Sequence, residues 1–232
     1  MRLCLCALLI CLTPLAGQAA ADDRGHAQLW QTAVVSLEVT RQQYDFLQPW
    51  TRQAQPVAKV GVVIAPRQIL TTAAELQDLT LVRVQKGGRG QWWTGAVLWA
   101  DYFANVALIT VDQPEFWQGL KPVALAPRLN LASSARIVRW NAGSFEMRKA
   151  EINRFDVTNP GFTDTAHVFA ELSAELGGAG WGEPAFDGKR LIGLVFAQIG
   201  NVCHTLPAPF IRSILDARAK PGYRGQIGRA HV

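Results

Sequence analysis

The chain is poor in cysteine, with four in 232 residues. Three of these, Cys4, Cys6 and Cys11, lie in an apolar N-terminal segment, so the rest of the chain keeps only Cys203. A single cysteine excludes an intramolecular disulfide bond. Because Cys203 lies in the apolar run NVCHTL, we expect a buried structural residue. A cysteine–histidine site with the adjacent His204 is the alternative.

Long apolar runs are absent after residue 21. Before it, the basic start Met1-Arg2 leads into the mostly apolar Leu3–Gly17 and the small residues Ala19–Ala21. This order is typical of a secretory signal peptide, and the run is shorter than the roughly 20 residues that span a bilayer. We therefore predict a signal peptide over residues 1–21 and, since no disulfide can form, secretion into a bacterial periplasm. An uncleaved anchor is the alternative.

Concentrated charge is also missing. The net charge is only +5, and the basic residues are scattered. They do not form the basic stripe with interleaved aromatic residues that is typical of a nucleic-acid-binding surface. No H-x-x-H, C-x-x-C or paired-carboxylate spacing indicates a metal site. We therefore expect no nucleic-acid partner, no cofactor, no metal and no membrane span once the signal peptide is removed.

What the chain does contain is a series of short β-branched and aromatic segments separated by turn residues, which are typical of strands. They lie at residues 33–39, 57–64, 79–85, 92–100, 106–112, 135–140, 146–157, 167–172 and 190–199. Strands of this length and spacing favour barrels or a sandwich over a parallel α/β sheet.

A helical pattern follows the last of these strands. Phe210, Ile211, Ile214 and Leu215 share one helical face, which predicts a helix over residues 208–220. The sequence thus predicts an all-β fold: two antiparallel six-stranded β-barrels with a C-terminal helix. Barrel one covers about 27–113, barrel two covers about 122–207, and together with the helix they make a domain over 22–220.

The segment LGGAGWGEPAFDGKRLIGL, residues 176–194, is built like a loop that presents a nucleophile. Its small residues allow backbone N–H groups to converge on a reacting oxygen. No serine, threonine or cysteine lies in it, however. The loop therefore has the form of a catalytic turn without the atom that attacks.

Together with this loop, three other stretches resemble the trypsin-fold serine proteases of the HtrA (Deg) type. GVVIAPRQILTTAAEL (61–76) is similar to the stretch that carries the family's histidine. ADYFANVALITVD (100–112) is similar to the stretch with the aspartate, and TLPAPFIRSIL (205–215) resembles the final strand and helix. The resemblance covers roughly residues 27–225 and implies the double-barrel fold of these proteases.

The same resemblance places substituted residues at all three catalytic positions. The histidine position falls on Ala74 and the aspartate position on Asn105. The serine position falls on Trp181 when Pro184 is matched to the family's proline, or on Ala179 when the Asp-Gly turn is matched instead. None of these side chains can serve as nucleophile or base in a serine–histidine–aspartate triad.

The resemblance therefore implies a pseudoprotease that binds a polypeptide or a partner subunit, including active HtrA-type proteases, and that can form a homo-oligomer. The expected peptide cleft consists of Gly180, Trp181, Gly182 and Glu183, the last standing where the family has glycine. Trp181 either shapes this cleft or fills the core between the barrels. An active serine endopeptidase with displaced catalytic residues and a purely structural envelope module are the alternative functions.

The last residues, 221–232, are predicted to be a truncated linker. PGYRGQIG resembles the entry into a PDZ domain, with which such proteases often continue. QIGRAHV can also be encoded by a common sequencing adapter, which predicts an artefactual tail over Gln226–Val232. A genuine flexible tail is the alternative.

Overall fold

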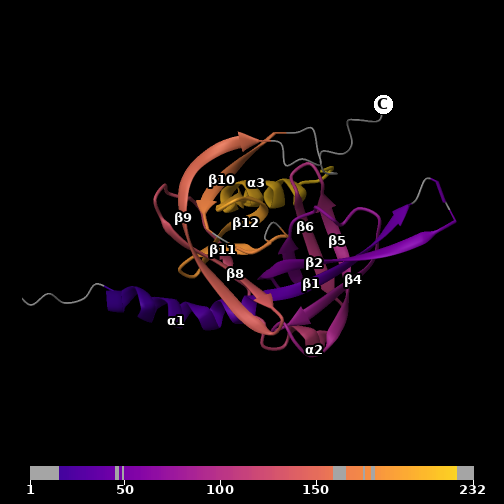
Figure 1. Cartoon of the computed structure of the whole chain (residues 1–232), viewed down its shortest axis with the longest axis horizontal. Coiled ribbons are helices and arrows are strands. Elements are labelled where there is room, and N and C mark those ends of the chain that lie inside the picture. Colours follow the sequence, from indigo (N-terminus) through magenta and orange to yellow (C-terminus); the bar gives the residue numbers. More distant parts are fainter. Residues whose placement is uncertain are drawn as a thin grey trace, which may run out of the picture.

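The computed structural model describes residues 16–44, 47–48, 50–158, 166–174, 176–178 and 181–223. This part of the chain forms two antiparallel β-structures that lie side by side, with β1–β6 on the right of Figure 1 and β8–β13 on the left. Helix α3 (Ala208–Arg218) follows the last strand, as the sequence predicts.

The first β-structure is a closed barrel with the strand order β1-β2-β3-β6-β5-β4. Its strands are β1 (Val34–Tyr44), β2 (Arg52–Ala65), β3 (Gln68–Thr71), β4 (Leu79–Lys86), β5 (Trp92–Asp101) and β6 (Val106–Val111). Val35, Leu37 and Val39 alternate along β1 and are buried inside, since successive side chains of a strand face opposite ways. The predicted six-stranded barrel is confirmed here.

The second β-structure is a sheet with the order β11-β8-β9-β10-β13-β12-β7. Its strands are β7 (Ala124–Leu125), β8 (Ser134–Asn141), β9 (Ser144–Thr158), β10 (His167–Ser173), β11 (Pro184–Asp187), β12 (Arg190–Ile199) and β13 (Val202–Pro207). Pairing of β11 with β12 closes a ring, to which β7 adds in parallel along β12. The ring has the six strands predicted for the second barrel. The two-residue β7, which is too short to show a pattern in the sequence, is a seventh strand of the sheet.

Helix α1 (Ala16–Ala33) precedes the first barrel, and the sequence does not predict it. Gly25 and several polar residues interrupt its apolar pattern. Its anchor is Trp30, which is fully buried, stacks on Phe186 and donates from Nε1 to the carbonyl oxygen of Gly188 at 3.0 Å. Residues 1–15 of the predicted signal peptide lie outside the described residues.

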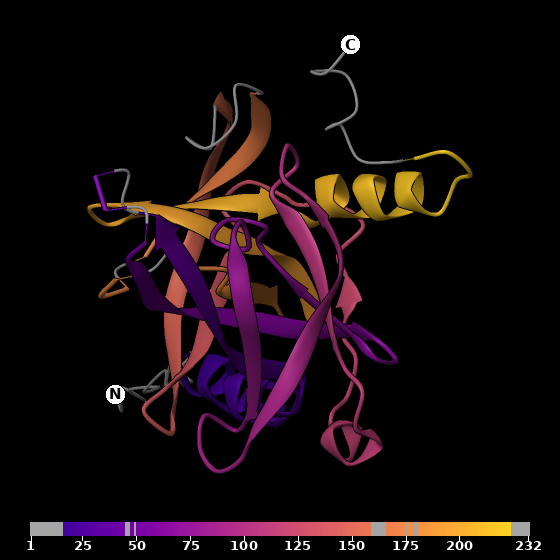
Figure 2. The same cartoon turned by 90° about the vertical axis from the view of Figure 1, so that its right-hand side faces the viewer.

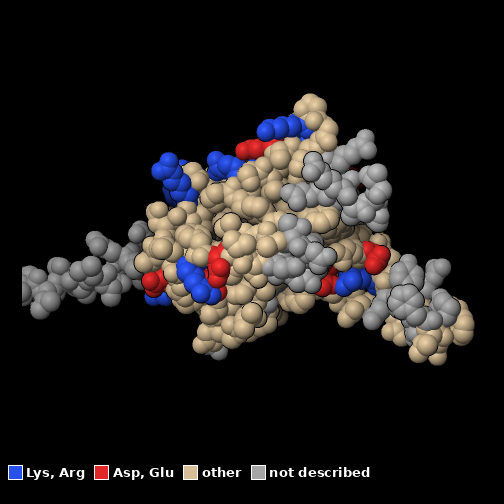
Figure 3. All heavy atoms as spheres, turned by 90° about the horizontal axis from the view of Figure 1, so that it is seen from above, with Lys and Arg blue, Asp and Glu red and all other residues tan. Residues whose placement is uncertain are grey.

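The core between the two β-structures positions the candidate site. Buried residues of the first barrel (Val60, Val62, Leu70, Val106, Leu108) meet buried residues of the second (Val138, Phe186, Leu191, Leu194, Leu206) and of α3 (Ile211, Ile214). Figure 2 shows α3 projecting beside the barrels, and the short helix α2 (Pro114–Trp117) lies at the end of the first barrel. The face seen in Figure 3 carries basic and acidic side chains in small mixed groups. Within the described residues no helix is long and apolar enough to cross a membrane.

Candidate functional site

Ala74 and Asn105, the positions predicted from the sequence resemblance to correspond to the family's histidine and aspartate, are in direct contact. Ala74 follows β3, and its backbone N–H donates to Asn105 Oδ1 at 2.9 Å. Asn105 is fully buried in a left-handed conformation, with φ of 55°, just before β6. Its Nδ2 has no hydrogen-bond partner among the described residues. The amide thus keeps one buried donor unused.

The turn that carries Asn105 is fixed by Asp101. The fully buried Asp101 accepts from the N–H of Ala104 at 2.9 Å and from the Tyr223 hydroxyl at 2.6 Å. Burial, with the hydrogen bond to Asp101, raises the pKa of Tyr223, so its hydroxyl remains a donor. Asp101 therefore holds the turn together and has both carboxylate oxygens engaged.

The loop that carries Trp181 is pinned to both β-structures. Val60 N–H on β2 donates to Trp181 O at 3.1 Å, and Gly182 N–H donates to Val195 O on β12 at 2.9 Å. Gly182 has φ of 98°, and a Cβ atom there would lie 2.8 Å from Val60 O, so only glycine fits. The Trp181 side chain is 39% exposed, so it does not fill the core between the barrels.

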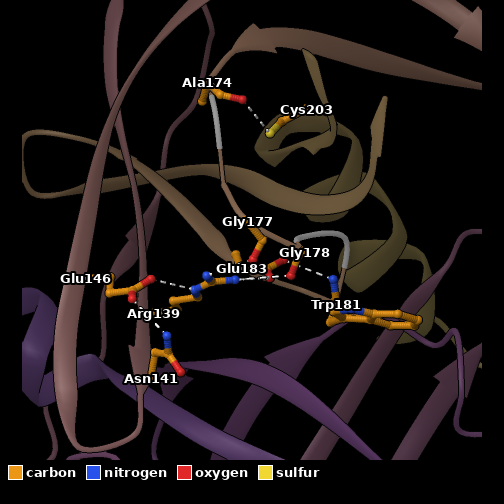
Figure 4. Close-up of polar contacts among 9 residues, drawn as sticks. All are labelled: Arg139, Asn141, Glu146, Ala174, Gly177, Gly178, Trp181, Glu183 and Cys203. Atoms are coloured by element: carbon orange, nitrogen blue, oxygen red, sulfur yellow. Dashed lines mark hydrogen bonds and ion pairs between the residues drawn. The ribbon is translucent and has the colours of Figure 1, made fainter. Parts of the chain in front are cut away.

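Glu183 turns its carboxylate back into this loop, although it is only 1% exposed. Its Oε2 accepts from the backbone N–H of Trp181 at 2.9 Å, and its Oε1 lies 3.7 Å from Arg139 Nη1 (Figure 4). Arg139 also donates to Glu146 at 2.9 Å and to the carbonyl oxygens of Gly177 and Gly178 at 3.1 Å each. In serine proteases the backbone N–H of the nucleophile is one of the two oxyanion donors. At Trp181, one of the two positions that the sequence predicts for that residue, the Glu183 carboxylate accepts this N–H.

A buried lysine lies beneath the same site. Lys59 on β2 is 2% exposed, and its Nζ donates to Thr72 Oγ1 and to Ala74 O at 2.8 Å each. Burial lowers the pKa of Lys59 to about 8, against the opposing charges of Glu75 and Glu183. The predictions made from the sequence do not include this residue, although a lysine inside the apolar strand VAKVGVVI was a signal for it.

A cavity of about 740 Å³ joins these elements. Its walls come from both β-structures and from the Trp181 loop. They are residues 36–38 of β1, 55–60 of β2, Gln85, Gly88, Trp92, residues 139–142 at the end of β8 and the turn after it, Gly177, Gly178, Trp181 and Glu183. Gly182 lies behind Trp181 against β2, while Ala179 and Gly180 fall outside the described residues. The volume is in the range of sites that hold a ligand or a short peptide segment.

Cys203, by contrast, is fully buried, as the sequence predicts. Burial raises the pKa of its thiol to about 11, so it stays protonated and lies against Ala174 O at 3.5 Å. His204 packs instead on Phe169 from the other face of β13. In the part of the chain that the structure describes, no three His, Cys, Asp or Glu side chains gather in a way that could hold a metal ion.

The sequence of the chain is similar to those of Do-like proteases. The chain is 25% identical over 185 residues to the mitochondrial protease Do-like 4 of Arabidopsis thaliana. This match covers 77% of this chain and 36% of that protein. It is 24% identical over 206 residues to the chloroplastic protease Do-like 2 of the same plant, covering 85% of this chain and 34% of that protein. The chain is homologous to the Do-like serine proteases. No family model matches it.

Solved structures share the fold of this Do-like protease homologue. The active form of the Rv3671c protease from M. tuberculosis superimposes with a TM-score of 0.69 at 17% identity and covers 85% of each chain. An inactive form of the same protease gives a TM-score of 0.65 and covers 92% of this chain. The chain thus has a trypsin-like protease fold, and it spans about a third of the length of the Do-like proteases described above.

Proposed function

We propose that this Do-like protease homologue binds polypeptides without cleaving them. The observation that carries the proposal is the chemistry of three positions, the contacting pair Ala74 and Asn105 and the cavity residue Trp181. Ala74 cannot accept a proton, Asn105 cannot carry the negative charge that stabilises an imidazolium, and Trp181 offers no nucleophilic oxygen. Trypsin-fold serine proteases hydrolyse peptide bonds with a proton acceptor, a stabilising carboxylate and a nucleophile acting together.

The Glu183 carboxylate supports the same conclusion. It takes the Trp181 N–H that would stabilise the oxyanion of a tetrahedral intermediate. It also places negative charge where negative charge would develop in the transition state. Loss of the triad costs on the order of a millionfold in turnover, and a filled oxyanion hole removes part of the residual rate enhancement.

Binding, rather than cleavage, fits the form of the site. The cavity is open, and the half-exposed indole of Trp181 stands at its wall with Trp92 and Trp140. Aromatic side chains of this kind anchor peptide side chains by apolar contact. We place this activity in the cell envelope of a bacterium, with a polypeptide or an active Do-like protease as the partner.

The test uses purified mature chain with casein and with a fluorogenic peptide library, beside a Trp181→Ala control. We expect hydrolysis at background for both proteins, and binding of fluorescently labelled unfolded casein that is weakened about tenfold or more by Trp181→Ala. Turnover by the unmodified chain that a serine-directed covalent inhibitor abolishes would overturn the proposal. Equal casein binding by both proteins would overturn the assigned role of Trp181.

A further inference from the structure

Lys59 is the only lysine buried within the described residues. The other five, Lys86, Lys121, Lys149, Lys189 and Lys220, are half-buried or exposed. The Lys59 side chain reaches from β2 toward the turn after β3, where Thr72 Oγ1 and Ala74 O accept from its Nζ. Two acceptors at 2.8 Å fix the position of the nitrogen.

This pair of acceptors matches the neutral amine better than the ammonium ion. An ammonium group has three N–H donors, whereas a neutral amine has two donors and a lone pair. The described residues offer Nζ two acceptors, so the neutral amine has both donors satisfied and keeps a lone pair. A buried lysine of this kind is a nucleophile for carbonyl groups.

The charges around Lys59 leave this neutral form well populated near neutral pH. Burial is the largest effect on its pKa, lowering it to about 8, and the carboxylates of Glu75 and Glu183 oppose it. Both carboxylates have cationic neighbours of their own. Arg41 pairs with Glu75, and Arg139 lies beside Glu183, which reduces the field that would hold a proton on Lys59.

Lys59 also belongs to the wall of the open cavity. The same cavity has the indole rings of Trp92, Trp140 and Trp181 in its walls. Aromatic walls bind an aromatic or extended apolar body, and they hold its reactive group close to a nucleophile. The proposed binding of polypeptides uses these indole rings but gives Lys59 no role.

We propose that Lys59 captures aromatic aldehydes covalently, as an imine, in this cavity. The Nζ lone pair forms a bond to the carbonyl carbon, and the carbonyl oxygen takes up a proton as Nζ loses one, giving a carbinolamine. Loss of this oxygen as water, with the second Nζ proton, leaves the carbon–nitrogen double bond. No oxidant or reductant takes part, and water is the only other product.

The experiment treats the mature protein with 2-naphthaldehyde and traps the imine with sodium cyanoborohydride at pH 7.5. Mass spectrometry of the digested protein locates the adducts. At this pH the neutral fraction of Lys59 exceeds that of an ordinary lysine by about 200-fold, offset by a lower intrinsic nucleophilicity. We expect labelling of Lys59 at least about tenfold faster than of any other lysine, with a midpoint near pH 8.

Two controls distinguish labelling inside the cavity from the general reactivity of lysine amines. The unreactive 2-naphthalenemethanol occupies the same space, so it should slow labelling of Lys59 and leave Lys86 unaffected. Lys86→Arg should leave the Lys59 rate unchanged, and Lys59→Arg should abolish the fast adduct. Labelling of Lys59 at or below the rate of the exposed lysines, or no protection by the alcohol, overturns the proposal. All of these measurements are independent of whether the protein binds casein.

Discussion

At the scale of single residues, Glu183 decides how far chemistry can be restored. Ala74→His, Asn105→Asp and Trp181→Ser would rebuild the three side chains of a triad, yet Glu183 would still hold the backbone N–H at position 181. Since losing one oxyanion donor costs about 100- to 1,000-fold in turnover, we expect this triple variant to stay near background.

Adding Glu183→Gly to the triple variant should raise cleavage of a fluorogenic peptide by about 100-fold. Glycine removes the carboxylate and is the residue that the resemblance to the family predicts at this place. The matched control carries the same changes with Trp181→Ala, which supplies no nucleophile and should remain inactive. Equal rates for the variants with and without Glu183 would show that its carboxylate does not block the site.

Lys59 gives a prediction for stability against pH. Its pKa of about 8 in the folded protein lies below the ordinary value of about 10.4, so the unfolded chain binds the proton more tightly between these limits. This group therefore costs stability below pH 8, and the cost disappears as the pH rises toward 10.4. The free energy of unfolding, relative to a Lys59→Met variant, should rise by about 2 to 3 kcal/mol between pH 7 and pH 10.

Urea denaturation of both proteins at the two pH values measures this difference. Subtracting the variant removes the contributions of other titrating groups, including Cys203, whose raised pKa acts in the opposite direction at alkaline pH. A pH-independent difference between the two proteins would show that Lys59 titrates normally.

At the scale of the elements, α1 contacts the core chiefly through one large side chain. Trp30 is fully buried against Phe186, and its indole N–H bonds to Gly188 of the second sheet. Trp30→Ala should destabilise the protein by about 3–5 kcal/mol, the usual cost of removing a large buried aromatic ring. Trp50, 79% exposed between β1 and β2, is the matched control, and Trp50→Ala should change stability by less than about 0.5 kcal/mol.

Thermal denaturation followed by circular dichroism compares the two variants. A Trp30→Ala protein as stable as Trp50→Ala would mean that α1 does not contribute to the folded core.

The sequence predicts those elements that carry their own pattern. Strands such as β1, with its alternating valines and leucine, and the amphipathic α3 are readable because each repeats its burial over several residues. Helix α1 and the short β7 are not readable, since contacts with distant segments form them. The candidate site divides in the same way. Trp181 and Glu183 are recognised in the sequence because they belong to a local loop motif. The role of Lys59 depends on contact between β2 and the turn after β3, which the sequence does not show.

At the scale of the whole molecule, the segment after α3 ties the end of the domain to the first barrel. The Tyr223 hydroxyl donates to the buried Asp101, whose turn carries Asn105. Tyr223→Phe leaves one oxygen of a buried carboxylate without a donor, and should lower the free energy of unfolding by about 1–3 kcal/mol. Ser213→Ala, a change on α3 that removes an exposed hydroxyl bonded only within the helix, is the control and should have little effect.

Chemical denaturation at pH 7 measures both variants. A Tyr223→Phe protein with unchanged stability would show that the turn holds Asn105 without help from this segment.

The hydrogen bond between Glu183 and the N–H of Trp181 bears on how such a protein can evolve. Donor and acceptor lie two residues apart on one loop, so the carboxylate competes with any diffusing anion at an effective concentration that free ligands do not reach. We therefore expect no measurable gain in turnover from a single substitution at position 74, 105, 181 or 183. Selection for hydrolysis acts only on a protein that has acquired all four changes together. Loss of hydrolysis is therefore hard to reverse. With the Glu183 carboxylate bound to the Trp181 N–H, single mutations can change what the cleft binds far more readily than they can restore cleavage.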